Sequence, residues 1–553
     1  MGSSSDYDEK DGTKLENEHH VEVSTKEVDT AVGVLAGQSG QLDPSEVIRI
    51  RQVLSFVVGF PRRNENNLGS TGRRLTDTFY RSCVYSTDNL GEFGDIRYHY
   101  IDPSDNQPVP LSLNGCSDID RLQYRLGTIF YLSYLVFEYP QNLALQRFPV
   151  GKWMSFNIFV WSVALCCHAA CTNFAGLFVV RLILGACEGS ITAGFLIVSS
   201  MFYTRNEQTV RVGYWFLMNG TAQIISGFIS FGSLHIKTSG FEPWQWLMVI
   251  TGVITFFTSI CFFLFFPDSP TNAWFLTPEE RVLAVLRIKE NQTGVENKHF
   301  KKEQMIEALL DPKTWLFALF AALTDVPNSL TNQRQLIVAS FGFTYLQTTL
   351  LTCVDGTIEI VTILTGVHLA ARIPNSRAYI GFVYFIPNIV GIIILNTLPW
   401  TDKVGLLFGQ WMTGFELFNT GVGTTGFVLA LAWLSSVTAG HTKRITTNAI
   451  MLSAYCIGNA VAPFMWQAKY KPRNHVPWTI IGICYGCGMI LLLVIRFYLA
   501  HQNKLRDAEP YDDQYDNVYI ERVNEDGSVE EVKVQKEFLD LTDLQNREFR
   551  YVL

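Results

Sequence analysis

The sequence predicts an all-α polytopic membrane protein. Only 17% of the 553 residues are charged and 48% are hydrophobic, whereas a soluble domain usually has about 25% charged residues. A helix that crosses the hydrocarbon core needs about 20 mainly apolar residues, and runs of that kind recur from Leu126 to near the end of the chain. The number and spacing of these runs therefore define the architecture.

About eleven predicted spans form two groups of five and six, separated by a hydrophilic segment. The first group lies at 127–146, 153–171, 175–202, 211–235 and 244–266. The second lies at 314–340, 349–371, 378–398, 404–436, 444–466 and 477–499. We therefore expect an N-terminal helix bundle at 126–266, a central loop at 267–312 and a C-terminal helix bundle at 313–500. In the loop, Thr277, Pro278 and Glu280 predict the N-cap, first residue and capping-box acid of an amphipathic helix.

The lysines and arginines of the short loops predict the orientation, because such residues concentrate on the cytoplasmic side. Four loops, each two spans from the next, contain Arg147 and Lys152, Arg205 and Arg211, Arg372 and Arg377, and Lys443 and Arg444. We place these loops, the central loop and the acidic tail 501–553 in the cytoplasm. The net charge of −8 comes largely from the two tails, so the sequence predicts no nucleic-acid partner.

The N-terminal region is anomalous. An odd number of spans would put the two tails on opposite sides of the membrane, yet 1–47 is acidic and polar, which is typical of a disordered cytoplasmic tail. One span is therefore missing before Leu126. The segment 48–125 has only the short apolar run VLSFVVGF and no clear helix or strand period. We interpret it as replacing the expected first helix.

Two charges stand inside one predicted span, where a charge costs about 3 kcal/mol on insertion scales. Arg181 and Glu188 in RLILGACE are about two turns apart and share a helix face. Arg181 either docks a substrate carboxylate or pairs with Glu188 or Glu138 to hold helices together. Glu188 is the better candidate for proton coupling. Glu138 either carries a proton or forms a gating ion pair with Arg147 or Lys152.

Further polar residues interrupt other spans. Trp215, Asn219 and Gln223 have i, i+4, i+8 spacing, so they either line a cavity or form interhelical hydrogen bonds. Other candidates are Asp325 and Asn328, which flank Pro327 at a predicted helix break, Asn448, and the acids Asp355, Glu359 and Glu416. Helix packing explains Asn448 as well as substrate contact does.

The basic loop residues have a simpler interpretation. We expect Arg147 and Lys152 to anchor at lipid headgroups and to pair with helix ends. In a transporter, such pairs would stabilise one of its two conformations, open to one side of the membrane. His441, Lys443 and Arg444 have the same interpretation.

Six long strings, in order along the chain, resemble one known family. They are FEYPQNLALQRFPVGKW (Phe137–Trp153), RLILGACEGSITAGF (Arg181–Phe195), SMFYTRNEQTVRVGYWFLMNGTAQIISG (Ser200–Gly227), FFPDSPTNAWFLTPEER (Phe265–Arg281), AGHTKRITTNAIMLSAYCIGNAVAPF (Ala439–Phe464) and FLDLTDLQNREFRYVL (Phe538–Leu553). The strings resemble the fungal allantoate permease family, which belongs to the anion:cation symporters of the major facilitator superfamily. The resemblance implies a major facilitator fold of two pseudo-symmetric helix bundles. Members normally begin with a helix that contains an "LDK"-like segment, which this chain lacks, so we expect a mis-spliced gene or a truncated copy.

The resemblance implies a transporter for small carboxylates and vitamins such as allantoate, nicotinate or pantothenate. We expect proton-coupled uptake of a small organic anion by a monomer in the plasma membrane, with both tails cytoplasmic and with protons and membrane lipid as the other partners. The alternative is a non-transporting nutrient sensor or an inactive truncated paralogue. An in-frame "LDK"-type helix upstream of Leu126 in the genomic DNA would favour the transporter. No HExxH, GxSxG or polar CxxC motif occurs, so we expect no enzyme, no cofactor and no metal.

Overall fold

Each predicted span coincides, at least in part, with a helix of the structure. The computed structural model describes residues 21–22, 113–236, 241–292, 297–330, 337–338, 340–343, 345–413, 424–471, 473–510, 518–523, 529–534, 536 and 539–553. Within these residues, seven helices are long and apolar enough to cross a membrane by length and composition. The prediction of a polytopic all-α membrane protein is therefore confirmed.

Five helices make up the first group. They are α4 (Leu113–Arg147), α5 (Val150–Ala170), α6 (Phe174–Phe202), α7 (Arg205–Ser233) and α8 (Pro243–Phe265). Local sequence explains where they begin. The side chain of Asn173 caps α6, and Thr204 forms a capping box with Glu207 at the start of α7.

Helix α4 begins earlier than the sequence predicts. It starts at Leu113, inside the segment 48–125 for which we expected no regular structure. Adding residues to an existing helix is far more favourable than starting a new one, so α4 extends past the apolar run that predicts only its membrane-crossing part. Residues 48–112, where we expected a replacement for the first helix, lie outside the described residues.

The central loop contains two helices and a short 3₁₀ turn. These are α9 (Pro278–Ile288), η4 (Lys289–Asn291) and α10 (Lys302–Leu310). Thr277 and Glu280 form the predicted capping box, and Pro278 is the first residue of α9. The predicted start of this amphipathic helix is confirmed.

The second group begins with a short helix. Helix α11 (Pro312–Asp325) gives way to the 3₁₀ turn η5 (Val326–Asn328), so the predicted span 314–340 is interrupted at Pro327. Proline has no backbone N–H and crowds the preceding turn, which explains the interruption. The predicted span 404–436 contains two helices, α15 (Lys403–Thr413) and α16 (Thr424–Ser436). The remaining elements are α13 (Tyr345–Arg372), α14 (Arg377–Thr397), α17 (His441–Val461), η7 (Ala462–Met465), η8 (Ala468–Tyr470) and α18 (His475–Asp507).

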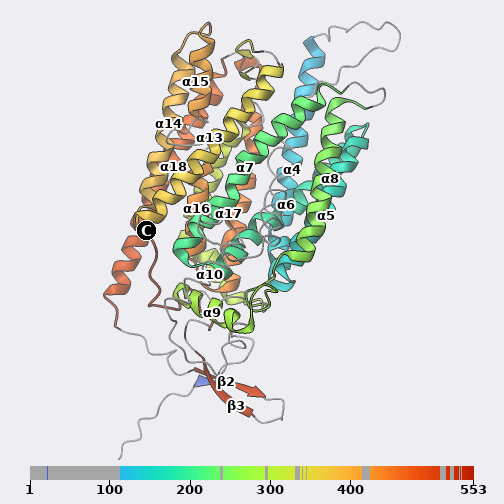
Figure 1. The fold of residues 1–553 in the computed structure, drawn as a ribbon. Helices are drawn as coiled ribbons and strands as arrows, with labels where there is room; N and C mark the ends of the chain where they lie inside the picture. Colours follow the sequence, from blue (N-terminus) through green and yellow to red (C-terminus); the bar gives the residue numbers. More distant parts are fainter. Residues whose placement is uncertain are drawn as a thin grey trace, which may run out of the picture.

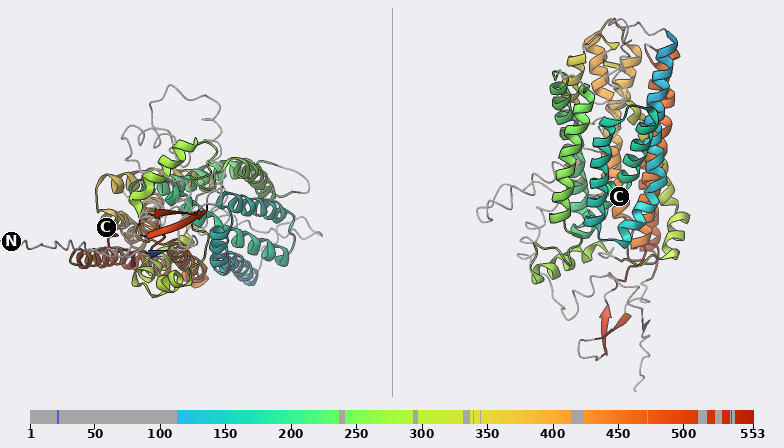
Figure 2. Two further views of the ribbon diagram at one scale, coloured as in Figure 1. Left: turned by 90° about the horizontal axis from the view of Figure 1, so that it is seen from below. Right: turned by 90° about the vertical axis from the view of Figure 1, so that its right-hand side faces the viewer.

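The two tails meet in a small sheet at one end of the molecule (Figure 1). Strand β1 (Val21–Glu22) pairs in parallel with β2 (Val518–Val523), which pairs antiparallel with β3 (Val529–Val534). Val21 and Glu22 therefore form a short strand within the tail that we expected to be disordered, because β2 offers them a free edge. Seen from below, the strands lie under the helices (Figure 2).

Two helix pairs form the largest contacts between the two groups of helices. Helix α7 runs beside α13, and α4 packs against α17 (Figure 1). At the α7–α13 contact the backbones approach closely, because a Cβ atom at Gly220 would lie only 2.5 Å from the carbonyl oxygen of Gly356. Small residues allow membrane helices to pack in this way. Helices α5 and α8 pack together on the outside of the first group, and α14, α15 and α18 on the outside of the second.

This close approach predicts that Gly220→Ala lowers the melting temperature. The added methyl group would overpack the contact, which typically costs about 1–3 kcal/mol, whereas alanine gains about 1 kcal/mol over glycine in a helix. Gly232→Ala on the same helix is the matched control, because a Cβ atom there has nothing within 4 Å. Thermal unfolding in lipid nanodiscs measures both variants. A Gly220→Ala melting temperature no lower than that of Gly232→Ala would contradict the close approach of α7 to α13.

Candidate functional site

Three of the predicted acids lie around one buried cysteine. Glu138 on α4, Glu188 on α6 and Asp325 at the end of α11 are all within electrostatic range of Cys456 on α17. The exposed fractions of the three acidic residues are 0%, 5% and 6%. The structure therefore brings these acids from both helix groups to a shared, buried junction.

Close packing of α4 against α6 creates this junction. A Cβ atom at Gly185 would lie 2.2 Å from the carbonyl oxygen of Phe130, and one at Gly189 would lie 2.9 Å from an oxygen of Glu138. The hydroxyl of Ser133 also donates a 2.6 Å hydrogen bond to the carbonyl oxygen of Leu182. The four-residue spacing of the two glycines lets α4 approach closely enough to place Glu138 beside α6.

Glu138 does not pair with the basic loop residues. In the described part of the chain its hydrogen-bond donor is Asn142, whose amide lies 2.7 Å from Oε1. Arg147 is exposed and follows Glu138 by nine residues, about two and a half turns, so the two side chains point to opposite faces of α4. Lys152 donates instead to the carbonyl oxygen of Phe263 near the end of α8, at 2.5 Å. Lys152 therefore contacts a helix end, as one part of its prediction states, while its anchoring at lipid headgroups stays a prediction. The alternative in which Glu138 forms an ion pair with Arg147 or Lys152 is not seen in this structure.

Arg181 is buried near the first turns of α6. It is 8% exposed and lies seven residues, about 10 Å, from the start of the helix. The ring of His168, at the end of α5, is close enough to interact with it electrostatically. A guanidinium held at this depth can bind a carboxylate with two parallel hydrogen bonds. Its predicted role in substrate binding stays a prediction.

The amides of α7 reach across to the second helix group. Asn219 and Gln223 donate to the two carboxylate oxygens of Glu359 on α13, at 3.0 and 2.8 Å. Of the two interpretations that the spacing left open, interhelical hydrogen bonding therefore has a direct partner in the structure. Trp215, one turn before Asn219, stacks on Phe195 of α6 with ring centroids 5.5 Å apart. Substrate contact by Trp215, Asn219 and Gln223 stays a prediction.

The remaining amide candidates lie on or beside α17. Asn328 in η5 donates to the side-chain oxygen of Asn459 at 2.8 Å, which fastens the break after α11 to α17. Asn448 is 1% exposed. On the same helix, Gly458 packs closely against Ala322 and Asp325. The choice between helix packing and substrate contact for Asn448 stays open.

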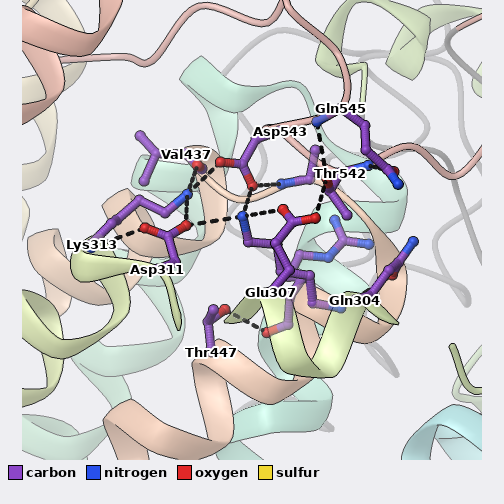
Figure 3. Close-up of polar contacts among 12 residues, drawn as sticks. Gln304, Glu307, Asp311, Lys313, Val437, Thr447, Thr542, Asp543 and Gln545 are labelled. Atoms are coloured by element: carbon purple, nitrogen blue, oxygen red, sulfur yellow. Dashed lines mark hydrogen bonds and ion pairs between the residues drawn. The ribbon is translucent and has the colours of Figure 1, made fainter. Parts of the chain in front are cut away.

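The sequence did not predict a second polar centre. It lies at the loop-bearing ends of the helices, by which we mean the ends next to the central loop and the C-terminal tail. The ammonium groups of Lys313 and Lys443 lie 2.7 and 2.9 Å from the two carboxylate oxygens of Asp543, in the C-terminal tail (Figure 3). Lys443 also lies 2.8 Å from Glu307 and 2.9 Å from Asp311. We call these five residues the lysine–carboxylate cluster. Both lysines and Asp543 have side chains that are 0% exposed.

The end of the tail is anchored on both sides of the cluster. Asp540 accepts hydrogen bonds from the backbone N–H of His441 at 2.7 Å and from the Asn297 amide at 3.1 Å. Gly440 has a φ of 86°, and a Cβ atom there would lie 3.0 Å from Thr542, so this position favours glycine for its backbone and for the tail. Further along, Phe549 lies under the guanidinium of Arg205 on α7, at 4.1 Å. The tail thereby touches both helix groups.

The structure corrects the interpretation of three basic residues. We expected His441, Lys443 and Arg444 to anchor at headgroups, but they are 3%, 0% and 1% exposed. The reason is that the tail returns carboxylates to the start of α17, and only the fold reveals this return. The string FLDLTDLQNREFRYVL was the one signal in the sequence, because it is apolar and acidic within an otherwise polar tail.

The pKa values of the two tail acids Asp543 and Asp540 shift in opposite directions. Burial alone would raise the pKa of Asp543, but the attraction of Lys313 and Lys443 outweighs it and lowers that pKa below the ordinary aspartate value. Burial raises the pKa of Asp540 in spite of the nearby Lys301. Asp543 therefore remains ionised over the physiological range.

Comparisons with known proteins all point to one family of membrane transporters. The Major Facilitator Superfamily matches residues 118–463. In Saccharomyces cerevisiae, the thiamine pathway transporter is 36% identical over 430 residues, which cover 77% of this chain and 77% of that protein. The allantoate permease of the same yeast is 31% identical and its high affinity cysteine transporter 30%, each over 77% of this chain and over 76% and 82% of their own lengths.

Two solved structures share the fold. The proton:xylose symporter XylE aligns with a TM-score of 0.56 at 11% identity, over 83% of this chain and 96% of that one. The human organic anion transporter MFSD10 aligns with a TM-score of 0.53 at 13% identity, over 81% and 100%. At such low identity these similarities establish the fold alone.

The cluster predicts that Asp543→Asn destabilises the protein. Removing one member of a buried ionic group typically costs about 3–5 kcal/mol, because the opposite charges remain buried without it. Thermal unfolding and chymotrypsin cleavage at Phe549 and Tyr551 measure the effect. Glu509→Gln is the control, because Glu509 pairs with Arg547 on the surface and should cause no measurable change. A variant as stable and as protease-resistant as the wild type would contradict the cluster.

The pKa directions predict that acidification does not release the tail. Because the pKa of Asp543 is lowered on docking, its contribution is present above the ordinary aspartate pKa of about 3.9 and is lost only as pH falls through the lowered value. Asp540, with a raised pKa, contributes more as pH falls. Titration of these two acids should therefore not weaken the docking of the tail between about pH 8 and about pH 5, and amide hydrogen exchange of residues 539–553, corrected for its intrinsic pH dependence, measures this. Release of the tail at the lower pH would refute this assignment.

Proposed function

We propose that this chain, which belongs to the major facilitator superfamily and within it to the allantoate permease family, takes up a small organic anion together with protons. The match over 118–463 and relatives such as the allantoate permease establish the family. The protein is therefore an integral multi-pass membrane transporter and not an enzyme. The substrate class, the coupling ion and the residues involved are the parts that we propose.

The observation that carries the proposal is the buried arginine. Arg181 is 8% exposed and lies about 10 Å along α6 from the start of the helix. A small carboxylate is the ligand that a guanidinium binds best. Two of the relatives are named for their solutes, cysteine and allantoate, and allantoate is an anion of this kind.

Proton coupling requires a carboxyl group that is neutral in one step and ionised in another. Glu188 is our leading proton acceptor, and Glu138 and Asp325 share its buried surroundings near Cys456. These acids lie between α4 and α6 of the first helix group and α11 and α17 of the second. Motion of one group against the other would change the surroundings of all three, which links protonation to the facing of the carrier.

The loop-bearing ends are our proposed cytoplasmic side. Lys313, Lys443 and Asp543 join α11, α17 and the tail there, and the contact of Arg205 with Phe549 adds α7 from the first group. The pairing of β1 with β2 keeps parts of the two tails on one side. We propose that both tails are cytoplasmic and that the protein is a monomer of the plasma membrane.

Uptake of labelled carboxylates tests this proposal. Cells expressing the chain should take up at least one of allantoate, nicotinate and pantothenate, faster at acidic external pH and not in the presence of an uncoupler. Arg181→Ala should abolish uptake because it removes the docking cation, and Arg181→Lys should keep a small part of it. Lys302→Ala, an exposed residue of α10, is the control and should transport normally.

Two outcomes would overturn the proposal. Uptake that ignores external pH, uncoupler and Arg181→Ala would refute the coupling scheme. A folded protein in the membrane that transports none of these anions, nor thiamine or cysteine, would refute transport and favour a nutrient sensor.

A further inference from the structure

The carboxylate of Glu359 ties the two helix groups together inside the membrane. It lies on α13 and is 2% exposed, and each of its oxygens accepts a hydrogen bond from an amide of α7. The donors are Asn219 at 3.0 Å and Gln223 at 2.8 Å. Glu359 is 14 residues from the start of α13 and 13 from its end, so it lies about 20 Å from either end.

The backbones beside this carboxylate are in contact. A Cβ atom at Gly356 would lie 2.4 Å from the carbonyl oxygen of Gly220. The thiol of Cys353 donates to the carbonyl oxygen of Ile224 at 3.6 Å, and the Tyr214 hydroxyl lies 3.0 Å from the His368 ring. The two helices therefore touch from Tyr214 to Ile224 on α7 and from Cys353 to His368 on α13, so a motion that separates the helix groups along this line opens the contact.

We infer that Glu359 is a protonation-controlled latch between the two helix groups. The ionised carboxylate accepts both amide N–H groups, and such charge-assisted hydrogen bonds are about twice as strong as neutral ones. A protonated carboxyl has an O–H on one oxygen and no charge, so it holds the two amides less well. The inference rests on the proposed function, because it names the group through which protons act on carrier motion.

Opening the contact and protonating the carboxyl favour each other. When α7 separates from α13, the carboxylate loses its donors at a depth where an ionised acid is costly, and it takes up a proton from the accessible aqueous side. In the closed contact the ionised form is favoured. The closed state is therefore stable at higher pH and loses stability as pH falls through the pKa of the closed form.

Other charged groups lie on the described helices that surround this contact. On α13, Asp355 is one turn away on the same face, and its negative charge favours proton uptake by Glu359. Helices α8 and α16 have no Asp, Glu, Lys, Arg or His within their bounds. His368 belongs to the same contact, where its ring lies 3.0 Å from the Tyr214 hydroxyl, two and a half turns along α13 from Glu359. The other charged groups on α13, α7, α6 and α14 are Arg372, Arg205, Glu207, Arg211, Arg181, Glu188 and Arg377.

Cys353 provides a native reporter for the latch. It is a free, partly buried thiol in the α7–α13 contact, so its alkylation rate should rise when the contact opens. The full-length chain in nanodiscs is treated with N-ethylmaleimide, and mass spectrometry follows Cys353, with Cys487 of α18 as the reference thiol. Wild type and variant are compared at the same pH, which cancels the pH dependence of thiol chemistry.

The latch predicts a pH-dependent difference between wild type and Glu359→Gln. At about pH 7.5 the variant should alkylate at Cys353 about tenfold faster, which corresponds to about 1.4 kcal/mol of lost charge-assisted hydrogen bonding. At lower pH the ratio should become smaller, because protonation of Glu359 weakens the closed contact of the wild type but not that of the variant. Asp355→Asn, the matched acid one turn away, should keep the pH dependence.

A second variant keeps the test valid if Glu359→Gln folds poorly. Asn219→Ala removes one donor and should give part of the same acceleration, and combining both substitutions should add little to Glu359→Gln alone. Equal rates in wild type and Glu359→Gln at every pH, or fully additive effects, would overturn the latch. The assay needs no substrate, so a failure of uptake with a working latch would refute the proposed substrate only.

Discussion

A buried charge or amide in a medium of low dielectric needs a partner, and this constraint shapes the contacts between the helices. Glu359 has two amides, and Lys443 has three carboxylates. In both places the partners lie on other elements than the residue that they contact. The polar groups therefore specify which helices meet, while the apolar surfaces supply most of the favourable burial.

The two polar centres act at different levels of the molecule. The contact of Glu359 with α7 crosses between the helix groups deep in the membrane. The lysine–carboxylate cluster belongs mainly to the second group and its tail, with Arg205 and Phe549 as the link to the first. This arrangement suits a carrier in which the deep contact opens and closes while the cluster keeps the second group and the tail in one piece. Glycines at the α7–α13 contact allow the carboxylate and amides to meet, so packing and polar chemistry reinforce each other there.

Much of the fold follows from the sequence because apolar length is a local property. The spans, the capping box at Thr277 and the break at Pro327 could all be predicted from neighbouring residues. The site could be predicted only in part. Spacing placed Asn219 and Gln223 on one face but could not identify Glu359, which is 136 residues further on, as their partner. Lys443 resembled a headgroup anchor because nothing near it in the sequence shows that Asp543 returns to it.

A pair of cryo-EM structures in nanodiscs, one at about pH 8 and one at about pH 5, tests the central claim most directly. At the higher pH the Glu359 carboxylate should lie between Asn219 and Gln223, and at the lower pH α7 and α13 should separate around it. The contacts of Asp543 with Lys313 and Lys443 should be the same in both. An unchanged α7–α13 contact at the two pH values, or a tail that leaves the lysines first, would contradict the account.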